Sequence, residues 1–139
     1  MANSELLIAD RLRFKHTGGM FKFEKLDVLA KAFGVDFADL VYSKTKSFPS
    51  DERFGLTNQM RRAAVSVSSN IAGGNARISD TDFARFVEIA TGSLFEVVSE
   101  STVAKRQAYL SEEDFAAIYK AAEEQGRMLS GLRRTLVGD

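Results

Sequence analysis

Residues 52–73 read ERFGLTNQMRRAAVSVSSNIAG. Within this stretch, apolar side chains recur every three or four residues, at Leu56, Met60, Ala63, Ala64, Val67 and Ile71. Such spacing collects them on one face of an α-helix, where they can be buried together. The stretch therefore predicts an amphipathic helix. Gly73 and Gly74 predict its end, because glycine readily adopts the positive φ of a helix C-cap.

The same spacing extends to three further segments, at about residues 24–46, 79–105 and 111–136. Ser79 and Ser111 stand at the start of the last two segments and predict N-caps. The only proline, Pro49, predicts a turn between the first and second helices. Because the connections are short, consecutive helices should be antiparallel. We therefore predict an all-α fold, an antiparallel up-down four-helix bundle.

The N-terminal segment differs from the rest of the chain. Residues 1–20 contain a short apolar run, but Gly18 and Gly19 interrupt any helical pattern there. We expect a poorly ordered N-terminal extension over residues 1–20, followed by one four-helix bundle domain over residues 21–139.

The composition argues against most enzyme chemistry. The 139 residues include 19 basic residues, 19 acidic residues, one histidine and no cysteine. Without cysteine there is no disulfide or thiolate nucleophile, and His16 alone cannot form a multi-histidine metal site. Glu96 and Glu100 lie one helical turn apart but lack the histidine co-ligands of a di-iron bundle. We therefore predict a non-enzymatic protein with no catalytic residue, cofactor or metal site.

The composition also bears on location and binding. No run approaches the roughly 18 apolar residues of a membrane span, and the first twenty residues lack the core of a signal peptide. We expect a cytoplasmic protein that does not bind membranes. Since the formal net charge is zero, binding to nucleic acid would require a local basic patch.

Several short motifs follow one another in order along the chain. They are FEKLDV at 23–28, FP at 48–49, ERFGL at 52–56, QMRRAAVSVSSNIA at 59–72, FARF at 83–86, IA at 89–90, GSL at 92–94, AKR at 104–106 and YLS at 109–111. Together they resemble the four-helix bundle proteins encoded by 23S ribosomal RNA intervening sequences, over about residues 21–136. The chain departs from that pattern at three positions, where the family usually has tryptophan, proline and glutamate: Leu29, Ser68 and Gly73.

The resemblance implies a homo-oligomer, usually a five-membered ring, so the likeness points to a homopentamer. It implies no established catalytic activity. It also suggests kinship with the accessory bundle of diversity-generating retroelements, which is associated with nucleic acid and a reverse transcriptase. That kinship is an analogy between folds.

Apolar and small residues also occupy the outer faces of the predicted helices. On the first helix, Val28, Val35 and Tyr42 recur every seven residues. The second helix carries a basic face of small residues, and the third an acidic one: Arg61, Arg62, Val65 and Ser69, and Glu88, Ile89, Gly92, Phe95 and Glu96. We predict that the outer face of the first helix is a protein contact, and that the Arg61/Arg62 and Glu88/Glu96 faces contribute to the docking of helices or of subunits. Between copies of the chain, a head-to-tail contact of this kind can close into a ring. The alternative is scattered surface hydrophobes and ordinary solvated charges.

Charge is distributed unevenly along the chain. Residues 44–77 hold six basic and two acidic residues, whereas residues 78–126 hold four basic and ten acidic residues. In a ring, the basic parts of all copies would together form a phosphate-binding surface. The candidate contacts to RNA or DNA are Arg53, Arg77, Arg133 and Arg134, and the alternative for each is a solvated helix end. The alternative function is a protein-only scaffold that recruits a polypeptide partner without nucleic acid.

Overall fold

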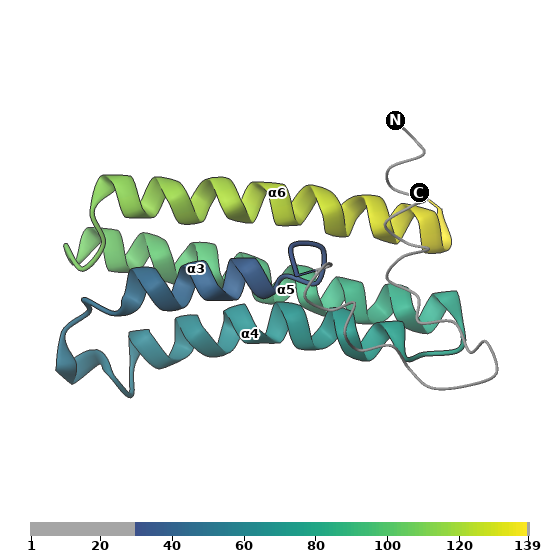
Figure 1. The fold of residues 1–139 in the computed structure, drawn as a ribbon, viewed down its shortest axis with the longest axis horizontal. Coiled ribbons are helices and arrows are strands. Elements are labelled where there is room, and N and C mark those ends of the chain that lie inside the picture. Colours follow the sequence, from purple (N-terminus) through teal and green to yellow (C-terminus); the bar gives the residue numbers. More distant parts are fainter. Residues whose placement is uncertain (1–29, 139) are drawn as a thin grey trace.

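The computed structural model describes residues 30–138 (Figure 1). Its elements are α3 (Val35–Thr45), the 3₁₀ helix η1 (Ser50–Glu52), α4 (Leu56–Asn75), α5 (Asp80–Arg106) and α6 (Glu112–Val137). No strand occurs within residues 30–138, so the predicted all-α fold with four α-helices is confirmed. The predicted N-terminal extension, residues 1–20, lies outside the described residues.

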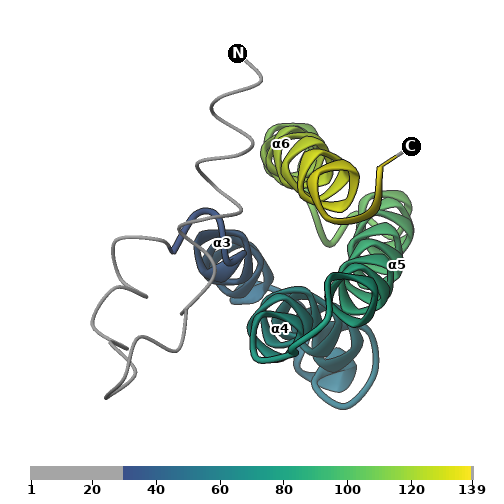
Figure 2. The same ribbon diagram turned by 90° about the vertical axis from the view of Figure 1, so that its right-hand side faces the viewer.

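The four helices pack side by side, and the chain reverses direction at each connection (Figure 1). Viewed end-on, α4 lies between α3 and α5, and α5 lies between α4 and α6 (Figure 2). Side-chain hydrogen bonds cross these boundaries. The Ser66 and Ser93 hydroxyls are 2.8 Å apart between α4 and α5, and Arg133 Nε of α6 donates to Glu88 Oε1 of α5 at 2.8 Å. None of the described helices combines the length and apolarity needed to cross a bilayer.

The two longest helices begin at the predicted serine caps. Ser79 Oγ accepts a hydrogen bond from the Asp82 backbone N–H at 3.1 Å, and Ser111 Oγ accepts one from the Asp114 backbone N–H at 3.0 Å. Each serine thereby pairs one of the backbone donors that a helix start leaves without an intrahelical partner. Both predicted N-caps are confirmed.

The first helix begins later than the sequence pattern predicts. Residues 30–34 form turns, and α3 starts only at Val35. Gly34 has φ +78°, its N–H donates to Lys31 O at 3.2 Å, and the Val35 N–H donates to Ala30 O at 2.8 Å. These are the two hydrogen bonds of a Schellman motif, which stops a right-handed helical turn. The predicted continuous helix is therefore wrong for residues 30–34, and residues 24–29 lie outside the described range.

Gly73 and Gly74 do not end α4 in the predicted way. Both lie inside the helix, which continues to Asn75, and neither has a positive φ. A Cβ atom on Gly74 would lie 2.7 Å from the Phe86 Cβ and 2.8 Å from the Phe83 Cδ1. Gly74 therefore serves close packing of α4 against α5, which the apolar spacing alone does not reveal.

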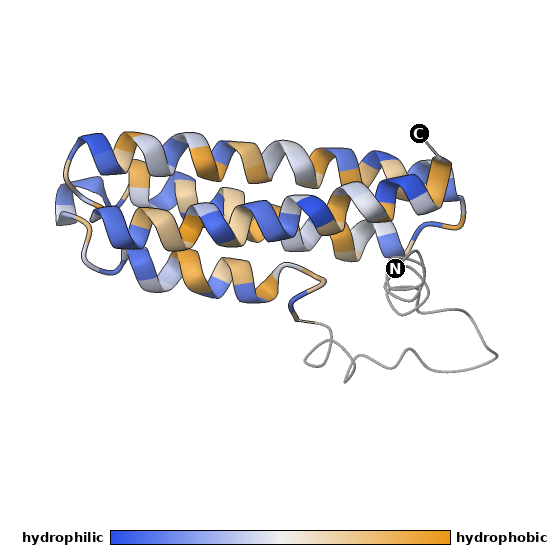
Figure 3. Cartoon of the chain, turned by 90° about the horizontal axis from the view of Figure 1, so that it is seen from above, coloured by the Kyte–Doolittle hydropathy of each residue, from blue (hydrophilic) through white to orange (hydrophobic). Residues whose placement is uncertain are grey.

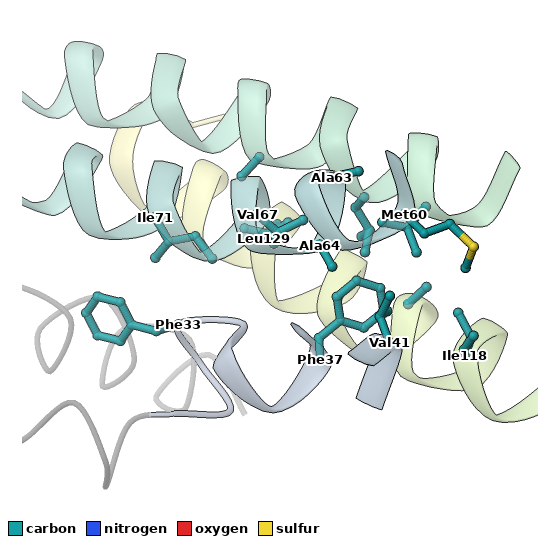
Figure 4. Packing of buried hydrophobic residues seen from close by; sticks show 14 of the residues in the cluster. Phe33, Phe37, Val41, Met60, Ala63, Ala64, Val67, Ile71, Ile118 and Leu129 are labelled. Atoms are coloured by element: carbon teal, nitrogen blue, oxygen red, sulfur yellow. The ribbon is translucent and has the colours of Figure 1, made fainter. Parts of the chain in front are cut away.

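The core contains side chains from all four helices and from the turn before α3. The predicted core face of α4 is confirmed, because Met60, Ala63, Ala64, Val67 and Ile71 are all buried. Figure 4 shows several of these side chains packed with Phe33, Phe37 and Leu129. Polar residues alternate with apolar ones along every helix (Figure 3), as amphipathic packing requires. Burial of each large apolar side chain contributes about 1.5–3 kcal/mol to stability.

Candidate functional site

Most residues of the predicted docking faces lie on the surface of the single chain. Phe95 is 69% exposed, Ile89 49%, Val65 and Tyr42 41%, and Val35 36%. The other exposed members are polar or small: Arg62, Ser69, Glu88, Gly92 and Glu96. Val28 lies outside the described residues. The fold of one chain thus leaves these apolar side chains in water, and their docking role stays a prediction.

Arg61 and Tyr42 contact each other within the chain. The Arg61 Nε donates to Thr45 Oγ1 at 2.9 Å, and its Cζ lies 4.7 Å from the centroid of the Tyr42 ring. Thr45 is buried and donates in turn to Val41 O at 2.8 Å. This set joins α3 to α4, because a guanidinium over an aromatic face is attracted by the ring quadrupole. Arg61 therefore contributes to the contact between two helices of one chain, and its role between subunits stays a prediction.

The predicted basic and acidic faces lie on adjacent helices of the same chain. The Ser66–Ser93 hydrogen bond fixes the register of α4 against α5, and Asn70 Nδ2 donates to Ser66 O at 2.8 Å beside it. One turn further along this antiparallel pair, residues 62 and 96 follow on the same side. Arg62 and Glu96 thus belong to one continuous outer surface, which we call the α4–α5 face and define by Arg62, Val65, Ser69, Ile89, Gly92 and Glu96.

Glu100 lies on α5 one turn after Glu96 and is the titratable group of this region with a distinctive environment. Burial, and secondarily the negative charge of Glu96, raise the pKa of Glu100 from 4.5 to about 7. Its Oε2 is buried and has no hydrogen-bond partner among the described residues. Solvent exclusion without a compensating donor disfavours the carboxylate, so Glu100 gains a proton near neutral pH.

Glu100→Gln should flatten the dependence of stability on pH. Because the pKa of Glu100 in the folded chain is raised from 4.5 to about 7, the folded state binds this proton more tightly than the unfolded state. The free energy of unfolding therefore falls as pH rises through that window. At pH 8 the variant should be more stable than the parent by about 1 kcal/mol or less, since the side chain is partly exposed and screened by water.

Urea unfolding at pH 4.5 and pH 8 measures this effect, with Glu113→Gln, an exposed acidic residue at the start of α6, as the control. If Glu100→Gln and the parent lose the same free energy of unfolding between pH 4.5 and pH 8, the raised pKa of Glu100 is contradicted.

Three of the four predicted nucleic-acid contacts lie at one end of the bundle. Arg77 is in the α4–α5 connection, and Arg133 and Arg134 are in the last turns of α6, at the same end in Figure 1. Arg53 is at the opposite end, beside η1. The fold therefore places three of the four candidate residues at one end of the bundle and the fourth at the other.

Arg133 and Arg77 have partners within the chain. Arg133 pairs with Glu88 at 2.8 Å, which joins the end of α6 to the start of α5. The Arg77 Cζ lies 4.7 Å from the centroid of the Phe86 ring. Glu88 was assigned to the docking surface and Arg133 to the nucleic-acid surface, so their ion pair links residues predicted to have separate roles.

A groove between α5 and α6 is the main surface feature that the sequence analysis missed. It has a volume of about 440 Å³, and its lining is mostly apolar: Leu94, Phe95 and Val98 with Ser99 on α5, and Tyr119, Ala122 and Gly126 with Glu123 on α6. Of these residues, Phe95 was predicted to belong to a docking face. The apolar spacing of α6 indicated its core face, but a groove depends on how two helices are spaced, which one helix does not encode.

Phe54 is a further surface feature that the sequence analysis did not identify. It is 87% exposed, between η1 and α4, and the Arg53 Cζ lies 5.7 Å from its ring centroid. A signal was present in the sequence, since Phe54 falls outside the apolar spacing of the helix that follows.

Within residues 30–138 no group of three or more potential metal ligands occurs.

Comparison with known proteins gives a family and a fold. The family model described as 23S rRNA-intervening sequence protein matches residues 24–131. No curated protein matches the chain significantly. Among solved structures, the chain is similar to a protein with unknown function from the S23 ribosomal protein family from Bacteroides thetaiotaomicron VPI-5482. The TM-score is 0.69 at 21% identity, over 78% of this chain and 97% of that chain. At this identity the structural likeness shows the fold alone.

Proposed function

The chain belongs to the family of 23S rRNA-intervening sequence proteins, and from this premise we propose that it is a non-enzymatic protein that assembles with copies of itself and binds nucleic acid. Neither the family description nor the described structural neighbour carries a catalytic assignment. The proposed place of action is the cytoplasm. The proposed assembly is a closed ring, for which the family resemblance favours five members.

The observation that supports self-assembly is the exposed apolar surface of well-formed helices. Val65 and Ile89 lie on the α4–α5 face, where they are 41% and 49% exposed, and Phe95, which lines the groove between α5 and α6, is 69% exposed. Exposed apolar side chains flanked by charges are typical of protein contact surfaces. Arg62 and Glu96 supply opposite charges on this face, so copies displaced along it can pair a guanidinium with a carboxylate.

Charge reversal on the α4–α5 face tests this assembly. Arg62→Glu and Glu96→Arg should each weaken association about tenfold, because each places like charges opposite one another in the contact. Combining both changes should restore much of the affinity. Sedimentation velocity over a dilution series measures the particle mass, and Lys120→Glu, an exposed residue of α6, is the control. Unchanged particles in both single variants would contradict the proposed docking face.

Nucleic-acid binding is supported by the shared position of Arg77, Arg133 and Arg134 at one end of the bundle. A ring would repeat this end once per copy, and the summed phosphate contacts would make binding strongly dependent on salt. The assembled protein should therefore retain generic single-stranded RNA at low ionic strength and release it as salt is added. If the assembled protein does not retain RNA at low ionic strength, this part of the proposal is contradicted.

A protein-only scaffold is the second candidate function. It is favoured by the Glu88–Arg133 ion pair, which already neutralises one predicted phosphate contact within the chain. A ring that forms but retains no RNA would support this candidate.

A further inference from the structure

Phe54 is an aromatic side chain that the fold of one chain leaves in water. It is 87% exposed and stands at the end of the bundle where α4 begins. The Arg53 guanidinium lies near its ring, with the Cζ 5.7 Å from the ring centroid. A large apolar side chain beside a cation combines the two features that dominate contact energies at protein interfaces.

Hydrogen bonds constrain the backbone of the turn that carries Phe54. The Arg53 N–H donates to Ser50 O at 3.2 Å, and the Gly55 N–H donates to Glu52 O at 3.0 Å. The Glu52 Oε2 accepts from the Leu56 N–H at 2.9 Å, which caps the start of α4. A Cβ on Gly55 would lie 2.9 Å from that same oxygen, so a larger residue there would displace the Glu52 carboxylate from its capping position. Phe54 thus extends outward from a hydrogen-bonded turn, whose backbone would require little further ordering on docking.

The groove between α5 and α6 offers a complementary site. It is a mostly apolar space of about 440 Å³ with Phe95 and Tyr119 on its lining and one charged residue, Glu123. Phe95 and Tyr119 are 69% and 47% exposed, so apolar surface of the groove is in contact with water. A pocket of this size accepts an aromatic side chain, and the Glu123 carboxylate can pair with an adjacent guanidinium.

We propose that Phe54 of a second copy of this chain inserts into the groove between α5 and α6, with Arg53 of that copy facing Glu123. This proposal rests on the self-assembly proposed above and names a contact within it. The copy must be a different one. Phe54 is fixed at one end of α4, whereas the groove lies midway along α5 and α6, and α5 separates α4 from α6 (Figure 2).

The proposed contact joins two different surfaces, a protruding side chain on one copy and a groove on the next. Such a head-to-tail contact generates a ring when the rotation between copies closes. Opposite charges on the two surfaces, Arg53 and Glu123, favour a second copy over a partner that lacks a basic residue next to its apolar side chain.

Phe54→Ala tests the inserted side chain. The dissociation constant for assembly of the full chain should rise ten- to a hundredfold, as measured by sedimentation velocity over a dilution series. Ile78→Ala is the matched control, because Ile78 is 96% exposed in the connection at the other end of the bundle and should leave assembly unchanged. Far-ultraviolet circular dichroism checks that both variants are folded.

The charge pair is tested in the same assay. Arg53→Glu and Glu123→Arg should each weaken assembly, and the double variant should regain at least part of the lost affinity, since the pair is then restored with reversed signs. A weakened Phe54→Ala assembly together with recovery in the double variant supports the contact. If Phe54→Ala assembles with the affinity of the parent, the proposed contact is overturned. That result would also be expected if the groove binds a different protein and not a second copy of this chain.

The same measurements separate this inference from the function on which it rests. If the parent chain is monomeric at every concentration, both self-assembly and the Phe54 contact are overturned. If the parent assembles and Phe54→Ala assembles equally well, only the Phe54 contact is overturned.

Discussion

Replacing Phe33 by alanine should lower the free energy of unfolding by about 3–5 kcal/mol, the usual cost of removing a buried phenylalanine side chain. Phe33 is 0% exposed and is among the largest fully buried side chains. It precedes Gly34 and therefore lies outside α3, yet it belongs to the same core cluster as Ile71 and Leu129 (Figure 4). The loss combines the missing apolar burial with the cavity left in a core that relaxes only in part.

Urea or guanidinium unfolding of the full chain measures this effect, at one protein concentration because association also contributes to stability. Ile78→Ala serves as the control, since this 96% exposed side chain should change stability by no more than about 0.5 kcal/mol. A loss below about 1 kcal/mol for Phe33→Ala would show that the turn before α3 is not packed into the core.

Alanine at Gly74 should have the opposite effect from alanine at Gly73. At Gly74 the added Cβ would lie 2.7 Å from Phe86 Cβ and 2.8 Å from Phe83 Cδ1, so α4 and α5 must move apart. Overpacking of this kind should lower the free energy of unfolding of Gly74→Ala by about 1–3 kcal/mol. At Gly73 the nearest atom, Phe86 Cε1, is 3.5 Å away, which is an ordinary contact. There the higher helix propensity of alanine should stabilise the chain by about 0.5–1 kcal/mol.

Thermal and chemical unfolding of the two variants measure the difference, and a third variant identifies its cause. Phe83→Leu should relieve part of the clash, so the Gly74→Ala and Phe83→Leu changes should be less damaging together than their sum predicts. Equal stabilities of Gly73→Ala and Gly74→Ala would contradict close packing at Gly74.

Apolar spacing and capping residues, which are local features of the sequence, predicted much of the fold. The spacing of Met60, Val67 and Ile71 predicted the core face of α4, and all three are buried. Ser79 and Ser111 predicted the starts of α5 and α6, because a serine hydroxyl pairs with a backbone N–H three residues later in the same segment. These features depend on one helix alone and are encoded within a few residues.

Glycine was the main source of error. The Gly73–Gly74 pair was interpreted as a helix end, but both residues remain helical. Gly34 was included in a continuous helix, but it adopts φ +78° and stops a helical turn. Glycine permits both a positive φ and a close helix contact, and its sequence context did not distinguish the two. The distinction lies in what packs against it, such as Phe83 and Phe86 at Gly74.

The sequence by itself determined the number of helices, the starts of α5 and α6, the family and the absence of thiol side chains, because periodicity, capping and residue type are properties of the chain. Only the tertiary structure decided that Glu88 pairs with Arg133, that Arg77 lies at the end of the bundle where α6 finishes, and that α5 and α6 leave a groove beside Phe95. These features join residues far apart in the chain. Their positions follow from the register and spacing of whole helices, which packing sets and local sequence does not.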